Sequence, residues 1–263
     1  MRRHAQQLAR SPRGGHDWGG PGNGLGIAGV DKMARMQPVR ALGTCFGWSS
    51  DVSDAIRWAA GLSVPGVPDN PTPAQVVNLS LGGSGACPSI EQLAIDDAVV
   101  AGAIVVAAAG NSASDLDSVP FSPASCNNVI AVAATTRFGD RANYSNFGSI
   151  VDIAAPGGWK PIDEGIVSLS NAGTTNADLS QAGWTYATKQ GTSMAVPHVS
   201  GVISLMLAAN DRLPIPNSTD PGTDRTTVPH VDSRRGVHLL KRPGRPPPLR
   251  SGFARRRRSG CGR

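Results

Sequence analysis

One serine of this chain stands where a nucleophile could be activated. Residues 191–201 read Gly-Thr-Ser-Met-Ala-Val-Pro-His-Val-Ser-Gly, and an apolar run over residues 202–209 follows. The pattern predicts a short flexible lead-in and then a helix from about Ser193 to Ala209. A serine at a helix N-terminus lies among unpaired backbone N–H groups and at the positive end of the helix dipole. Negative charge that develops on a substrate oxygen would be stabilised there, as acyl transfer by serine requires.

The elements that must position this serine alternate between short apolar runs and helical patterns. Strands are expected over residues 36–42, 75–80, 104–109, 128–134, 151–154 and 166–169. One helix is expected to follow Ser50 and stop at Gly61, and another to span Ser89–Val100, with Gly102 just beyond its end. This alternation predicts an α/β fold with a mostly parallel sheet flanked by helices.

The charge of the chain divides into three parts. The formal net charge is +6, but residues 1–22 carry +3, residues 23–211 carry −7 and residues 212–263 carry +10. The C-terminal part is rich in Pro, Arg, Ser and Thr and has no apolar periodicity, which is typical of disorder. We therefore expect a basic disordered arm over 1–22, a folded domain over 23–210 and a basic disordered tail over 211–263.

Several classes of protein are disfavoured by the composition. The N-terminus has basic residues without an apolar segment, so no signal peptide is expected. The sequence contains no run of about 18 apolar residues, so no transmembrane helix is expected either. The tail contains one Phe and no interleaved aromatic residues, which argues against nucleic-acid binding. No Cys-x-x-Cys pair indicates a metal site. Cys87 and Cys126 lie in loop-like sequence, where a disulfide is plausible in an oxidising compartment.

Residues 191–201 resemble the nucleophile motif of the subtilisin-like serine peptidases, G-T-S-M-A-x-P-H-V-x-G. They do not form the G-x-S-x-G elbow of an α/β-hydrolase. Ala107–Asn111 resembles the A-A-G-N segment of the subtilisin-like family, and residues 78–83 resemble its N-x-S-L-G-G strand. Other segments match the family in the same order along the chain, so that the resemblance covers residues 23–210; they are 38–43, 144–148 and 154–157.

The resemblance implies a role for particular residues. Ser193 would be the nucleophile, and Asn111 would donate to the oxyanion together with the Ser193 N–H, although Asn111 alone could merely end a strand in a turn. The substrate polypeptide would add to a strand edge as an extended chain. The residues that would bind it are Ser80, Leu81, Gly82, Gly83, Ala108, Ala109 and Gly110. The family further implies a secreted bacterial monomer, and it often binds calcium, for which no ligand set stands out here.

The motifs that would supply the other catalytic groups are absent. The family's chain order is Asp, His, Ser, yet neither its Asp-containing strand end nor its H-G-T-H-V-A-G motif occurs. His198 belongs to the serine motif and is expected to pack on the helix, while His16 and Asp17 lie on an arm without fixed geometry. We therefore expect an endopeptidase domain that is incomplete at its N-terminus and inactive or nearly so. The alternative is a non-catalytic pseudoenzyme that binds peptides.

A shifted reading frame would account for the missing motif. Residues 23–30 resemble what the family shows shortly after its histidine motif. Residues 3–18 can be encoded so that a one-base shift gives A-T-P-N-S-W-H-G-A-H-V-A-G-T-I, and residues 225–232 so that a shift gives A-R-P-F-P-T-S. We hypothesise that both ends are out-of-frame translation of a subtilase gene, which the nucleotide sequence around codons 1–25 would test.

Overall fold

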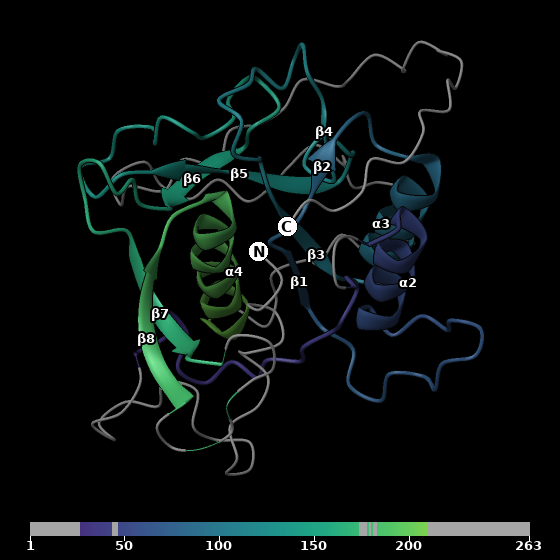
Figure 1. The fold of residues 1–263 in the computed structure, drawn as a ribbon. Coiled ribbons are helices and arrows are strands. Elements are labelled where there is room, and N and C mark those ends of the chain that lie inside the picture. Colours follow the sequence, from purple (N-terminus) through teal and green to yellow (C-terminus); the bar gives the residue numbers. More distant parts are fainter. Residues whose placement is uncertain (1–26, 44–46, 174–177, 179, 181–182, 210–263) are drawn as a thin grey trace.

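Four parallel strands form the centre of the molecule (Figure 1). The computed structural model describes residues 27–43, 47–173, 178, 180 and 183–209. The sheet has the order β1 (Val76–Leu79), β3 (Ile104–Ala108), β5 (Val129–Thr135) and β6 (Ile153–Pro156), and each neighbouring pair is parallel. The α/β fold with a parallel sheet flanked by helices is therefore confirmed.

Helices cover both faces of this sheet. Helices α2 (Ser49–Ala59) and α3 (Ser89–Val100) lie together on one face, and α4 (Thr192–Ala209) lies on the other (Figure 1). Helix α3 ends where the sequence predicted, because Gly102 follows it with a φ of 96°, a backbone conformation that glycine adopts without a steric cost. Helix α4 begins one residue before the predicted start.

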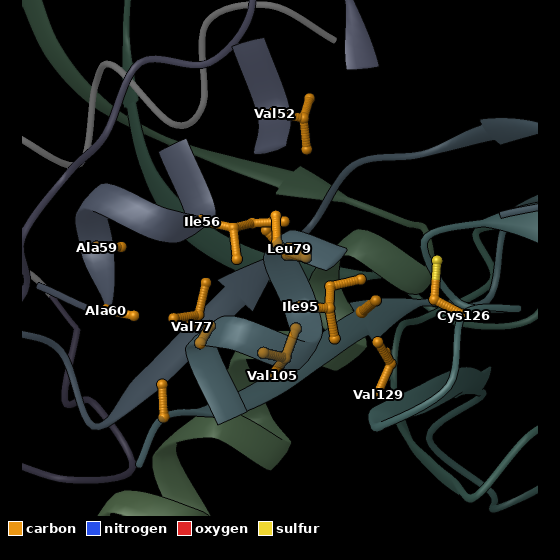
Figure 2. Close-up of a cluster of buried hydrophobic side chains, with 14 residues drawn as sticks. Val52, Ile56, Ala59, Ala60, Val77, Leu79, Ile95, Val105, Cys126 and Val129 are labelled. Atoms are coloured by element: carbon orange, nitrogen blue, oxygen red, sulfur yellow. The ribbon is translucent and has the colours of Figure 1, made fainter. Parts of the chain in front are cut away.

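Each face of the sheet buries its own apolar cluster. On the side of α2 and α3, Ile56, Ile95 and Val105 are 1% exposed or less (Figure 2). On the side of α4, Val106 packs with Val196, and both are fully buried. The neighbours Val105 and Val106 thus face opposite ways, as successive residues of a strand must. Because β3 is covered on both faces, its sequence is apolar throughout.

Two small antiparallel sheets accompany the central one. Strand β2 (Gly83–Ser84) pairs with β4 (Phe121–Ser122), and β7 (Ile166–Asn171) pairs with β8 (Trp184–Lys189). Strand β7 is longer than predicted, and β2, β4 and β8 were not predicted. Strands β2 and β4 have two residues each, which is too short for any alternation of apolar and polar residues to show in the sequence.

The predicted strand over residues 36–42 is wrong, because this segment forms no strand. Pro38 lies within it and has no backbone N–H to donate to a neighbouring strand. The side chain of Gln37 instead donates to Asn70 Oδ1 at 2.9 Å. Val39 and Ala41 still pack against the cluster of α2 and α3. Among the described residues, β1 consequently has a strand on one side only.

Helix α4 is apolar enough, by length and composition, to cross a membrane. Its 18 residues have a mean hydropathy of 1.4. The sequence-based expectation against such a helix rested on uninterrupted apolar runs, which Ser200 and Ser204 prevent. In the structure, α4 packs against the sheet through Val196 and Val199. The predicted arm over 1–22 and the predicted tail over 211–263 lie outside the described residues.

A disulfide joins two loops at one end of the sheet. Cys87, just before α3, is bonded to Cys126, which lies between β4 and β5 and is fully buried. This is the pair that the loop-like sequence around both cysteines indicated. The bond closes a segment that contains α3 and β3, so it ties the start of α3 to the turn that follows β4.

Candidate active site

Ser193 lies in the first turn of α4, at the edge of the sheet where the parallel strands end. The first N–H groups of a helix have no partner within the helix, so the Ser193 N–H is available to a ligand. Gly191 introduces the helix, and its own N–H donates to Gly157 O at 3.1 Å. The Ser193 residue is half-buried. The sequence therefore folds here as the serine motif predicted.

Asn111 is held in one orientation by the residue that precedes the serine. Its Oδ1 accepts from the Thr192 N–H at 2.8 Å and from Thr192 Oγ1 at 3.0 Å. A backbone N–H can only donate, so the atom facing it is the amide oxygen, and Nδ2 points away. Within the described residues, Nδ2 donates to no protein group. The arrangement presents a free amide donor beside the start of α4.

Asn146 fixes the loop that carries Asn111. Its Nδ2 donates to Ala109 O at 2.8 Å, while its Oδ1 accepts from the N–H groups of Ser112 at 2.9 Å and Ser114 at 3.0 Å. Asn146 is 1% exposed, so these bonds replace those it would make with water. Asn146 lies in the segment 144–148 that resembles the family, but the resemblance predicted no role for it. The signal in the sequence was an amide residue within the matched turn-like segment 144–148, and its burial became visible only in the structure.

Ser80 connects the end of β1 to the serine. Its Oγ donates to Ser193 O at 2.9 Å and accepts from Asn78 Nδ2 at 2.8 Å. Leu81 is half-buried, while Gly82 and Gly83 are exposed. The structure thus brings Ser80–Gly83, Asn111 and Ser193 together, although they are far apart in the sequence.

The other predicted substrate-binding segment is buried. Ala108 is 2% exposed and Ala109 is fully buried, and the backbone of Ala109 and Gly110 is already hydrogen-bonded. The Gly110 N–H donates to Thr192 Oγ1 at 3.2 Å, and its carbonyl accepts from the Asn146 N–H at 3.0 Å. Of the residues predicted to bind substrate, Ala108–Gly110 is therefore buried, whereas Gly82 and Gly83 are exposed, and their contact with a polypeptide stays a prediction.

No described residue is placed to act as a base toward Ser193. His198 is the one histidine in the described ranges, and its Nδ1 lies 2.8 Å from Met194 O. A carbonyl can only accept, so Nδ1 carries the proton of that bond. His198 thus hydrogen-bonds to the backbone of its own helix. In the part of the chain that the structure covers, no side chain hydrogen-bonds Ser193 Oγ. His4, His16, Asp17, His230 and His238 lie outside the described residues.

No cluster of acidic side chains marks a metal site in the described part of the chain. No group of three or more His, Cys, Asp or Glu side chains gathers there. Asp163 is typical: its carboxylate oxygens accept from the backbone N–H groups of Arg137, Trp159 and Gly165 at 2.7–3.0 Å. Because such carboxylates already serve backbone donors, we assign no ligand to a metal.

Comparisons with known proteins agree with one another. A model of the subtilase family matches residues 15–228. An extracellular protease of Xanthomonas campestris pv. campestris is 49% identical over 184 residues, which are 70% of this chain and 30% of that protein. Thermitase of Thermoactinomyces vulgaris is 36% identical over 204 residues, which are 75% of this chain and 62% of thermitase.

A solved structure resembles the fold as well. A protease from Pseudoalteromonas arctica PAMC 21717 superposes with a TM-score of 0.69 at 45% identity, over 74% of this chain and 57% of that one. The chain spans 30% of the Xanthomonas protein and 29% of an extracellular basic protease of Dichelobacter nodosus. The matched region is thus one part of each of these longer relatives.

Proposed function

Because the chain belongs to the subtilase family, we propose that it carries the nucleophile and the oxyanion donors of a serine endopeptidase, next to an edge that binds polypeptide. Ser193 is the nucleophile, and Asn111 Nδ2 and the Ser193 N–H are the donors. The observation that carries the proposal is the pair of hydrogen bonds from Thr192 to Asn111 Oδ1, since they aim the amide nitrogen outward beside the serine.

The geometry supports a separate role for the strand edge, for Ser193 Oγ and for the two donors. An extended substrate lies along Ser80–Gly83, with its carbonyl carbon at Ser193 Oγ. When Oγ attacks, its proton must pass to a base, which the described residues do not supply, and the carbonyl oxygen becomes negative and receives hydrogen bonds from the two donors. A donor of this kind typically lowers the barrier by about 2.7–4 kcal/mol, because it is already in position when the charge develops.

No base lies beside Ser193 among the residues that the structure describes, and this favours a second function, the binding of polypeptides without hydrolysis. Among the described residues, the one histidine is turned to Met194 O and does not reach the serine. Loss of the base alone typically costs on the order of a million-fold in kcat, since the triad acts as a unit. In this form the chain would be a pseudoenzyme that keeps the binding edge of its family.

We also place the chain outside the cell. Two relatives are named extracellular proteases, and the Cys87–Cys126 disulfide is of a kind that persists in oxidising compartments.

The first experiment measures binding of a fluorescent alanine-rich peptide by anisotropy. Wild type and Ser193→Ala should bind it equally, because Oγ is not needed for strand pairing. Gly83→Leu should weaken binding at least about tenfold, since a side chain at Gly83 projects into open space over the edge. Gly29→Leu, also at an exposed and sterically open glycine, is the matched control and should bind as wild type. Equal binding by Gly83→Leu and wild type would remove the edge from the proposal.

The second experiment separates the two functions. A fluorophosphonate probe labels only an activated serine, and hydrolysis of a peptide substrate reports turnover. The pseudoenzyme should bind the peptide but show neither activity. Labelling and turnover at the rate of an intact relative, both lost in Ser193→Ala, would establish the endopeptidase and overturn the pseudoenzyme.

A further inference from the structure

The carbonyl of Ser193 lacks the partner that a helix normally provides. In an α-helix, each carbonyl accepts from the N–H of the residue four positions further along. For Ser193 that residue is Pro197, which lies inside α4, has no N–H and crowds the carbonyl four residues before it with its ring. Ser193 O accepts instead from Ser80 Oγ at 2.9 Å. The turn that carries the serine is therefore held by a side chain from outside the helix.

A chain of hydrogen bonds continues from Ser80 and returns to α4. Asn78 Nδ2 donates to Ser80 Oγ at 2.8 Å, which leaves the Ser80 hydroxyl proton for Ser193 O. Asn78 Oδ1 accepts from Ser200 Oγ at 3.1 Å. The two ends of the chain, Ser193 and Ser200, thus belong to the same helix and lie about two turns apart.

Ser200 lies outside the residues that define the serine motif. It occupies the second position written x in G-T-S-M-A-x-P-H-V-x-G, where the motif asks for no particular residue. Asn78 is exposed, so its amide could otherwise turn toward water. The bond from Ser200 Oγ requires an acceptor, and it therefore selects the orientation in which Oδ1 faces Ser200 and Nδ2 faces Ser80.

We propose that Ser200 is a positioning residue of this site. Acting through Asn78 and Ser80, it fixes the Ser193 carbonyl and with it the direction of the Ser193 N–H. That N–H and Asn111 Nδ2 then face the same negatively charged oxygen. This inference rests on the proposed function, because it presupposes such an oxygen at the two donors.

The test measures by calorimetry how much more tightly the protein binds acetyl-tetraalanine with a free carboxylate than the same peptide as an amide. This preference reports on the donors, since the N-terminus of a helix binds anions. Ser200→Ala removes the hydroxyl, and Ser200→Thr keeps one. Ser204→Ala is the matched control, because it removes a hydroxyl one turn further along α4 that donates to Asp31 Oδ2, outside this chain of bonds.

Ser200→Ala should lower the preference for the carboxylate at least about threefold, as the loss of one net hydrogen bond does, and leave the affinity for the amide unchanged. Ser200→Thr and Ser204→Ala should keep the preference of wild type. Asn78→Ala should lower it as Ser200→Ala does, and the double variant should lower it no further, because both changes break the same chain of bonds.

A merely structural role of Ser200 would lower the stability in urea denaturation and leave the preference as it is. An unchanged preference in Ser200→Ala therefore overturns the inference while the proposed function stands, and so does an equal loss of affinity for both peptides. If wild type itself does not prefer the carboxylate, the oxyanion donors of the proposed function fail, and this inference fails with them.

Discussion

Removal of the Cys87–Cys126 disulfide should destabilise the chain by a predictable amount. The two cysteines are 39 residues apart. In the unfolded chain the bond closes this loop, and the chain-entropy relation for a loop of that length gives about 4 kcal/mol at 25 °C. Disulfides typically stabilise by about 2–4 kcal/mol, so we expect Cys87→Ala with Cys126→Ala to lose that amount.

The assay is urea denaturation followed by circular dichroism, in a background with Cys45→Ser and Cys261→Ser to prevent exchange. Cys87→Ala alone breaks the same loop and leaves the fully buried Cys126 in place, so it should lose nearly as much as the double variant. A reducing agent should lower the stability of the parent to that of Cys87→Ala and leave the variant unchanged. A loss below about 1 kcal/mol in both variants would refute the reasoning.

Three further changes probe the core, the carboxylate and the support of Asn111. Ile95→Ala, at a fully buried side chain, should cost about 2–5 kcal/mol in urea denaturation, and a cost below about 1 kcal/mol would contradict the described core. Burial raises the pKa of the Glu91 carboxyl, and this effect outweighs the hydrogen bond from Ser122, which lowers the pKa. Folding thus favours the protonated carboxyl, and its stabilising effect, full below the ordinary value of 4.5, is lost as the pH rises through the raised pKa. Glu91→Gln should flatten this dependence of the urea midpoint on pH, and an unchanged slope would argue against it. Thr192→Val leaves one buried N–H unpaired and one bond to Asn111 missing, so it should cost about 1–3 kcal/mol and weaken peptide binding, whereas unchanged stability would contradict the described bonds.

The sheet and its helices could be predicted because their signals are local. Strand β3 is buried on both faces and reads as one apolar run, while α3 has helical periodicity and ends before Gly102. The strand predicted over 36–42 was wrong, because Pro38 lies within the segment and, among the described residues, it pairs with no strand although Val39 and Ala41 pack on the core. Apolar composition alone does not distinguish a paired strand from a segment that merely packs on the core.

The candidate site could be predicted only where a motif carried it. The resemblance indicated Ser193 and Asn111, and the structure shows them joined through Thr192. Nothing in the sequence placed Ser200 against Asn78, since that contact depends on the packing of α4 beside β1. The burial of Ala108–Gly110 likewise depends on tertiary packing, which no local pattern encodes.

The central claim is that Asn111 and the Ser193 N–H form a site for a negatively charged oxygen. Its most direct test compares the affinities of acetyl-tetraalanine with a free carboxylate and of the same peptide as an amide. Hydrogen bonds to a charged group are worth about 1.5–3 kcal/mol, so wild type and Ser193→Ala should bind the carboxylate at least about tenfold more tightly. Asn111→Ala should lose most of that preference. Equal affinities for the two peptides in wild type, or a preference that Asn111→Ala leaves intact, would contradict the claim.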